Sequence, residues 1–220
     1  MPTKNTIKNY LEGGRYHIYN RGVDKRKIFL DKQDCAVFLY YLKLYLSPPE
    51  TFQYTQPLSF RLQHKLLTMN LSQEIELMAF ALMPNHFHLQ VRQATKDGIQ
   101  KFMRRVATSY AQYFNKKYER IGTLFESTYK AVMIETDDQN LYLSAYIHRN
   151  PMKLQVDELG FKELSSYPYY LKFKHASWIK PNEILSFFTE SNIHLSYKTF
   201  VETSPDNLLS KLKNLTLEED

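Results

Sequence analysis

A β-hairpin with two histidines on one strand is the feature that most constrains the fold of this chain. The run 77–83 is apolar, Pro84-Asn85 is a turn signal, and extended character resumes from His86 to Val91. Side chains alternate along a strand, so His86 and His88 point to the same side of a sheet. Two such imidazoles can bind one metal ion or one phosphate, although a chance pair of surface histidines remains the alternative.

The second informative segment is a predicted helix over residues 137–150, which a proline follows. We expect one of the two aspartates at its start, Asp137 or Asp138, to cap it. Tyr146 and Asn150 are four residues apart and therefore share a face of this helix. The apolar or aromatic positions have helical spacing: Leu141, Tyr142, Ala145 and Tyr146.

These side chains together predict a phosphoryl-transfer site. His86, His88 and the amide of Asn150 can hold a divalent metal ion that polarises a phosphate oxygen, while the phenol of Tyr146 attacks phosphorus. Seventeen tyrosines are present, and Tyr142 lies one turn earlier on the same helical face, so it is the competing nucleophile. Tyr146 is preferred because only it is paired with the amide of Asn150.

Two further histidines receive other interpretations. His148 follows Tyr146 by two positions and should point to another face of the helix, where we expect a surface or DNA-contacting residue and not a third imidazole ligand. His17 lies in a predicted first strand. We interpret it as a structural histidine, and its position on a strand leaves a role in the site open.

The combination of motifs resembles the single-tyrosine HUH transposases (IS200-like transposase domain), and among them the REP-associated tyrosine transposases of bacteria. The resemblance covers roughly residues 10 to 170. It rests on His86-Phe87-His88, on Tyr146 to Asn150 before a proline, and on Gly13 to Gly22, Met83-Pro-Asn-His, Gly122 to Glu126 and Asn150-Pro-Met-Lys153.

This resemblance implies a metal-dependent endonuclease and transposase that cleaves and rejoins single-stranded DNA through a 5′-phosphotyrosine intermediate at Tyr146. The expected partner is single-stranded or hairpin (REP-like) DNA, and the expected cofactor is Mg²⁺ or Mn²⁺. Two imidazoles would suit Mn²⁺ or Zn²⁺ as well. The alternatives are a domesticated hairpin-DNA-binding protein of the same fold and a zinc hydrolase, for which the sequence lacks a His-Glu-x-x-His motif.

The order of predicted elements is β-α-β-β-α-β followed by the tyrosine helix. It predicts an α+β protein with a ferredoxin-like, split β-α-β antiparallel sheet, helices packed on one face, and the histidine strands beneath the tyrosine helix. We expect a catalytic domain over residues 1–175, with an insertion at about 47–73 that is partly helical from Ser59, and a C-terminal extension or tail over 176–220. The expected elements are a strand at 15–21, a helix at 31–46, a hairpin at 74–93, a helix at 97–118, a strand at 129–135, the helix at 137–150, and a short helix from Lys180 to Thr189.

The formal net charge of +6 favours a polyanionic partner, because lysines and arginines that neutralise phosphates release counterions. Between Lys96 and Lys130, basic residues alternate with aromatic ones, a pattern that suits single-stranded DNA. An amphipathic helix with its aromatics in the core is the alternative. The candidate DNA contacts are Arg21, Lys25, Arg26, Arg104, Arg105, Lys116, Lys117 and Lys130.

The remaining features predict a cytoplasmic protein. Cys35 is the single cysteine, so an internal disulfide is impossible, and its apolar surroundings predict a packed core residue. No segment reaches the length of a transmembrane helix, and no signal peptide is visible. The sequence is compatible with either a monomer or a homodimer that exchanges the tyrosine helix.

Overall fold

The computed structural model describes residues 10–51, 68–157, 159–188 and 192–203. Most of the predicted insertion, and the end of the chain after Thr203, lie outside the described residues. The strands are β1 (Arg15–Arg21), β2 (Ile75–Met83), β3 (His86–Gln93) and β4 (Lys130–Ile134). The helices are α1 (Lys32–Leu46), α3 (Gly98–Lys117), α4 (Asp137–Arg149), α5 (Tyr167–Tyr170), α6 (Asn182–Leu185) and α7 (Ile193–Thr203), with short 3-10 turns at 23–25, 49–51, 151–153 and 161–163.

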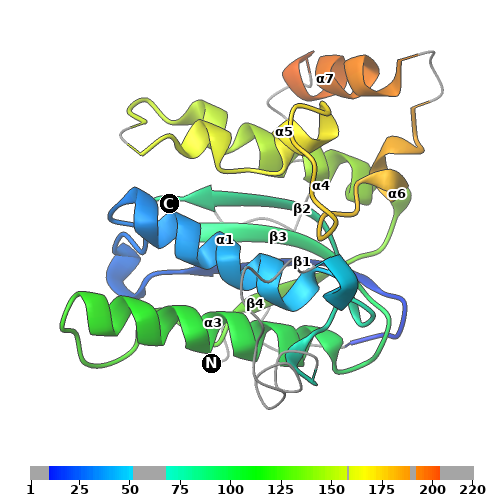
Figure 1. The fold of residues 1–220 in the computed structure, drawn as a ribbon. Helices are drawn as coiled ribbons and strands as arrows, with labels where there is room; N and C mark the ends of the chain where they lie inside the picture. The colour runs from blue at the N-terminus through cyan, green and yellow to red at the C-terminus, as the bar shows by residue number, and fades with distance from the viewer. Residues whose placement is uncertain (1–9, 52–67, 158, 189–191, 204–220) are drawn as a thin grey trace.

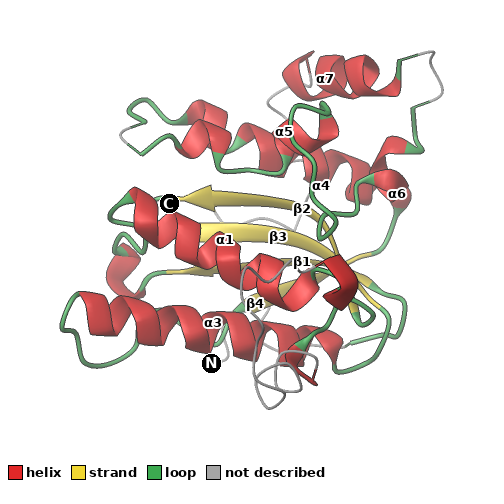
Figure 2. Ribbon diagram, viewed as in Figure 1, coloured by secondary structure: helices red, strands yellow, loops and turns green. Residues whose placement is uncertain are grey.

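The four strands form one antiparallel sheet in the order β2-β3-β1-β4. In each of the two β-α-β units, β1-α1-β2 and β3-α3-β4, one strand of the other unit lies between the two strands. The units therefore interleave, and β1 and β3 are the central strands (Figure 2). This is the ferredoxin-like, split β-α-β arrangement that the element order predicts, and the α+β fold class is confirmed.

The two faces of the sheet are covered by different helices, because side chains alternate along each strand. α1 and α3 pack on the face that carries Ile18, Phe87 and Leu89, and this side holds the largest hydrophobic core. α4 packs on the opposite face through Leu143 and Ile147 (Figure 1). His86 and His88 belong to this second face, so the histidines lie beneath the tyrosine helix as predicted.

Helix α1 begins where the sequence indicated. Asp31 is its N-cap, and its side chain accepts a hydrogen bond from the Asp34 backbone N–H while the Asp34 side chain accepts one from the Asp31 backbone. This reciprocal pair satisfies two backbone donors at the start of the helix. Cys35 follows in the same turn and is buried, as predicted.

The aromatic residues of α3 belong to the core. Phe102, Tyr110 and Phe114 are buried against α1 and the sheet. Tyr113 and Tyr118 are partly buried, and both hydroxyls donate to the carboxylate of Asp34. The expectation that these rings stack on DNA bases is therefore wrong, and the amphipathic alternative is right, because their i, i+4 spacing turns them toward the sheet.

The chain after α4 returns to the outer edge of β2. The backbone N–H of Leu82 donates to Leu164 O, and the N–H of Ser166 donates to Phe80 O. Further along the same edge, the N–H of Lys180 donates to Leu77 O. These hydrogen bonds cover the edge of a strand that would otherwise present unpaired backbone groups.

α5, α6 and α7 pack against α4 in a further apolar cluster, which includes Ala145, Tyr170, Leu185 and Tyr197 (Figure 1). α6 ends at Leu185, earlier than expected, and Thr189 lies outside the described residues. The division of the chain near residue 175 stays a prediction. Among the described residues, no helix combines the length and the apolar character needed to cross a membrane.

Candidate active site

The face of the sheet beneath α4 carries a row of polar side chains on the two central strands. In the antiparallel register, His86 of β3 lies opposite Arg21 of β1, and His88 lies opposite Tyr19. One pair further along, Gln90 lies opposite His17. We call this side of the sheet the histidine face. It collects titratable groups from two strands that are distant in the sequence.

The imidazole of His86 is oriented by the residue that precedes it. Its Nδ1 lies 2.7 Å from Oδ1 of Asn85. The Nδ2 of Asn85 donates to the backbone carbonyl of Lys25, so the oxygen of this amide faces His86 and Nδ1–H of the ring is the donor. Burial, and then the positive charge of Arg21, lower the pKa of His86 to about 4. The ring is therefore neutral near pH 7, and its Nε2 carries a lone pair.

His88 is completely buried. Its Nδ1 is hydrogen-bonded to Nε2 of His17 at 3.0 Å, and its own Nε2 has no hydrogen-bond partner among the described residues. Burial holds the pKa of His88 well below its usual range. A buried nitrogen without a partner is costly unless a ligand supplies the missing interaction, so this atom is the strongest sign of a binding site on the histidine face.

Tyr146 of α4 lies against His88. The centroids of the two rings are 5.6 Å apart, and their planes are nearly perpendicular, at 80°. The tyrosine is partly exposed and packs against the small apolar cluster that includes Ala81 and Ile147. Asn150, one turn later, is the C-terminal cap of α4, and its backbone N–H donates to Tyr146 O. The structure thus brings His86, His88 and Tyr146 together and places Asn150 at the adjacent helix end.

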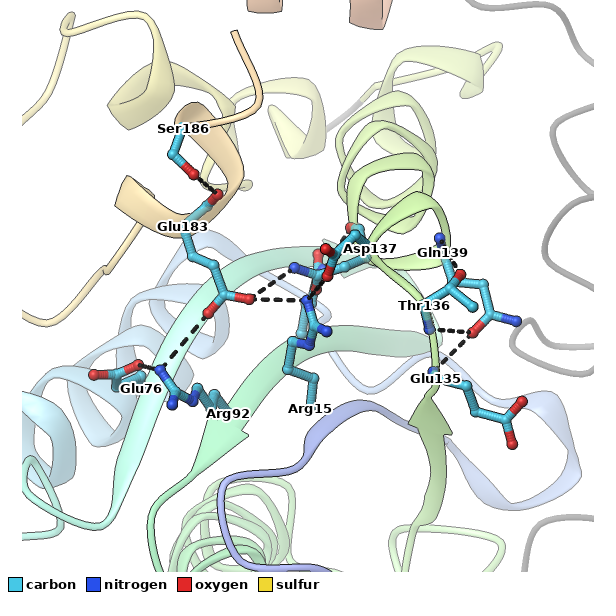
Figure 3. A network of polar contacts seen from close by, with 11 residues as sticks. Arg15, Glu76, Arg92, Glu135, Thr136, Asp137, Gln139, Glu183 and Ser186 are labelled. Carbon is cyan, nitrogen blue, oxygen red and sulfur yellow. Dashed lines mark hydrogen bonds and ion pairs between the residues drawn. The ribbon is translucent and has the colours of Figure 1, made fainter.

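The first turn of α4 is held on the sheet by a network of ion pairs, drawn in Figure 3. The guanidinium of Arg15 contacts Asp137 at 2.7 Å and Glu183 of α6 at 3.0 Å, and Arg92 reaches the same glutamate. Beneath the helix, Nε2 of Gln90 donates to Asn140. These interactions join α4 to the sheet, and they thereby fix the position of Tyr146 over the histidine face.

The cap of α4 differs from the prediction. Thr136 is the N-cap: its hydroxyl oxygen accepts from the backbone N–H of Gln139, and Oε1 of Gln139 accepts from the backbone of Thr136 (Figure 3). The aspartates expected to cap, Asp137 and Asp138, lie in the first turn. A capping box needs a partner three residues later, and Thr136 has one in Gln139.

His148 corrects another expectation. It does point away from His86 and His88, but it is completely buried and not on the surface. Its Nε2 lies 2.6 Å from the hydroxyl of Ser166, and its Nδ1 lies 2.7 Å from the hydroxyl of Tyr197 in α7. Burial lowers the pKa of His148 to about 3. The sequence does not reveal this burial because the covering aromatic residues come from distant segments.

Tyr142, the competing nucleophile, lies one turn before Tyr146. Its ring packs against Phe200 of α7, with centroids 5.5 Å apart. It also borders the small apolar cluster between α4 and the sheet. Tyr142 is thus associated with α7, whereas the ring of Tyr146 packs directly on His88. The geometry favours Tyr146 over Tyr142 as the residue of the site.

Four of the basic residues expected to contact DNA lie near the histidines. Arg21 faces His86 across the strands and pairs with Glu126 at 2.9 Å. Lys25 and Arg26 follow in the loop after β1, where the backbone carbonyl of Lys25 accepts from Asn85 and the Arg26 side chain donates to Val23 O. Lys130 lies in β4 with its ammonium over the ring of Tyr19. These four residues form the basic margin of the histidine face.

The other four lie on α3, against the opposite side of the sheet. Nζ of Lys117 contacts Asp31 at 2.6 Å and the buried Asp34 at 2.8 Å. Arg105 donates to the backbone carbonyl of Met69. Arg104 and Lys116 are exposed, and Arg104 lines a groove of about 1040 Å³ between α3 and residues 123–129. The structure therefore does not bring the eight basic residues together on one surface.

The donor set on the histidine face suits a metal ion with open coordination positions. Asn85 and His17 each occupy the Nδ1 side of one histidine, which leaves the Nε2 atoms of His86 and His88 as the available ligands. Within the described residues, no third histidine, cysteine or carboxylate joins them in a metal-binding group. The amide of Asn150, a phosphate or water would have to complete the coordination.

Sequence reasoning missed the role of Asn85 and left a role of His17 in the site open. Asn85 belongs to the Met-Pro-Asn-His motif, where the sequence by itself indicates only a turn residue. His17 faces the site because strand β1 pairs with β3 in a register that places Gln90 opposite it. The split β-α-β order predicts that β1 lies beside β3, and alternation along β1 indicates which of its residues share a face. The sequence contains no signal for the register that places His17 against His88.

The fold and the site together define a ferredoxin-like α+β protein in which a histidine pair lies under a tyrosine-bearing helix. Residues 37–150, more than half of the chain, match the family model described as "Transposase IS200 like". The chain belongs to this family of transposases, and the resemblance inferred from the motifs is confirmed at that level.

A solved structure of a REP-associated tyrosine transposase bound to a REP hairpin has a similar fold. The TM-score is 0.50, the sequence identity is 13%, and the match covers 86% of this chain and 96% of the other. At this identity the likeness establishes the fold alone. A search among curated proteins gave no match.

Proposed function

We propose that this transposase cleaves and rejoins single-stranded DNA through a 5′-phosphotyrosine intermediate at Tyr146. The observation that carries the proposal is the contact between His88, whose buried Nε2 has no partner among the described residues, and the ring of Tyr146. The arrangement combines a nucleophile with an adjacent ring whose nitrogen can hold a metal ion, and these two elements suit attack on a phosphodiester.

In the proposed reaction, the phenol oxygen of Tyr146 attacks a backbone phosphorus. A bond forms between this oxygen and phosphorus, and the phenol loses its proton. The bond from phosphorus to the 3′ oxygen breaks, and the departing oxygen takes up one proton to become a 3′-hydroxyl, so no net proton is gained or lost. Attack by the same or another 3′-hydroxyl reverses these steps and releases the tyrosine. Because one phosphoester replaces another, the exchange needs no external energy source.

His86, His88 and Asn150 are the proposed metal ligands, and Mg²⁺ or Mn²⁺ is the proposed ion. When bound, a divalent ion supplies charge that polarises the non-bridging oxygens of the attacked phosphate. Imidazole nitrogens are softer than the ligands that Mg²⁺ usually takes, so the chemistry of the ligands favours Mn²⁺ in a direct comparison.

The proposed substrate is hairpin-bearing, single-stranded DNA. Two observations support it: the similar solved structure is of a protein bound to a REP hairpin, and the histidine face has a basic margin formed by Arg21, Lys25, Arg26 and Lys130. Cations beside the scissile position hold the DNA backbone without reading its sequence.

The test is a covalent-adduct assay with two labelled versions of one hairpin-bearing strand and a divalent ion. Because Tyr146 would join the phosphate at the 5′ end of the downstream fragment, a 3′-end label should remain on the protein after denaturation. A 5′-end label should appear on a free fragment ending in a 3′-hydroxyl. A zinc hydrolase would release both fragments without an adduct, and a domesticated binding protein would shift the DNA without cutting it; either result would reject the proposal.

A further inference from the structure

We infer that His17 is a positioning residue that sets the tautomer of His88 and thereby keeps Nε2 of His88 unprotonated and ready to bind a metal ion. The inference rests on the proposed function. The two rings are hydrogen-bonded between Nε2 of His17 and Nδ1 of His88 at 3.0 Å, and neither side chain is exposed to solvent.

When both imidazoles are neutral, the hydrogen bond between them contains a single proton, so two arrangements are available. If Nε2 of His17 carries the proton, Nδ1 of His88 accepts it and the proton of His88 must be on Nε2. That would leave a buried N–H group without any acceptor in the described structure. If Nδ1 of His88 carries the proton, its Nε2 is instead a bare lone pair.

The second arrangement is the one that fits the rest of the site. A buried, unsatisfied N–H group is rarer in folded proteins than an unsatisfied acceptor. His86 provides an internal precedent, because the orientation of the Asn85 amide already requires its Nδ1 to be the donor. With both rings protonated at Nδ1, both Nε2 atoms are lone-pair donors on the same face of the sheet.

The packing of His17 restricts the ring orientation as well as the proton. The rings of His17 and His88 are nearly parallel, with an interplanar angle of 20° and centroids 5.1 Å apart. The ring centroid of His17 also lies 4.9 Å from that of Tyr19. His17 is thus held in place by its own neighbours, so it can in turn hold His88.

Three substitutions separate the hydrogen bond from the packing. The amide oxygen of His17→Gln reaches the position of Nε2 and can still accept from His88. His17→Asn is shorter and leaves that position empty. His17→Phe keeps an aromatic ring in the stack but has no acceptor. Thermal unfolding of each variant measures separately how much the substitution at residue 17 changes the stability of the fold.

The direct readout is the tautomer of His88, measured by ¹⁵N NMR of histidine-labelled protein without metal. We expect a protonated Nδ1 and an unprotonated Nε2 in the wild type and in His17→Gln, and a shift toward protonated Nε2 in His17→Phe and His17→Asn. The second readout is Mn²⁺ affinity by calorimetry, where the loss of a residue that orients a ligand typically costs 10- to 100-fold. We expect a loss of at least about tenfold in the Phe and Asn variants and recovery in the Gln variant.

A wild-type His88 protonated at Nε2 would overturn the inference, and so would Mn²⁺ affinity that is unchanged in His17→Phe and His17→Asn. If His17→Phe does not fold, the comparison of Gln with Asn decides alone. Neither readout uses DNA. A negative covalent-adduct assay would therefore count against the proposed function and would leave the inference about the tautomer of His88 to be decided by these two readouts.

Discussion

The ring of Tyr146 meets the ring of His88 edge to face, with centroids 5.6 Å apart, although the two residues come from different layers of the protein. Tyr146→Phe keeps this packing and removes only the hydroxyl. We expect the covalent DNA adduct to disappear while DNA affinity changes by less than about twofold, because a single hydroxyl at a partly exposed position contributes little to binding. Tyr142→Phe is the matched control and should keep the adduct; the opposite pattern would assign the nucleophile to Tyr142.

His86→Ala, His88→Ala and Asn150→Ala should each abolish divalent-dependent cleavage, with smaller effects on DNA affinity. The reason is that polarising a phosphate is a catalytic role, whereas holding the backbone is done by surrounding cations. His175→Ala changes an exposed histidine after α5 and serves as the control. If cleavage continues undiminished in excess EDTA, the proposal that it depends on a divalent metal ion is wrong.

The two groups of basic residues should differ in their effect on DNA binding. The double substitution Lys25→Gln with Lys130→Gln removes two charges from the margin of the histidine face. Arg104→Gln with Lys116→Gln removes two exposed charges on α3. We expect the first pair to reduce the slope of log K for DNA binding against log salt concentration by roughly one unit for each phosphate that the protein no longer neutralises. We expect the second pair to change this slope less. Equal effects would mean that DNA also extends along α3.

Lys117 should matter for stability and not for DNA. Its ammonium neutralises Asp34, whose carboxylate is fully buried. We expect Lys117→Met to lower the free energy of unfolding by about 1–3 kcal/mol, because it leaves a buried charge with hydroxyl and backbone partners only. Lys116→Met, at the neighbouring exposed position, should change it by less than about 0.5 kcal/mol. Urea titration of both variants gives the comparison.

His148 should make the protein sensitive to acid. In the folded state its pKa is lowered from 6.5 to about 3, so the unfolded chain binds a proton first as pH falls. Its contribution to stability is therefore complete above pH 6.5 and declines between pH 6.5 and about 3. At about pH 5 the loss is on the order of 2 kcal/mol from this residue. His148→Gln should start from lower stability near neutral pH but show a shallower decline, and an unchanged slope would contradict the assignment.

The order of elements and most of their bounds could be predicted from the sequence, because each depends on local signals. β1 runs from Arg15 to Arg21 as predicted, and α1 begins after Asp31 because a capping box is a local pattern. The fold class followed from the order of strands and helices, since few topologies bury both faces of a four-stranded sheet.

What could not be predicted depends on pairing between distant segments. The ion pair of Lys117 with Asp34 and the burial of His148 by Tyr197 both join residues far apart in the sequence. The same applies to His17, which reaches His88 because of the register in which β1 pairs with β3. A basic residue on a helix surface gives no sign in the sequence of whether it faces DNA or an internal carboxylate.

The hydrogen bonds of Leu164 and Ser166 with β2 act as an anchor for the chain that leaves α4. β2 pairs in turn with β3, the strand that carries the histidines. A homodimer that exchanges α4 would therefore have to break the contacts between α4 and its own sheet, while residues 164–166 could stay attached to the edge of β2.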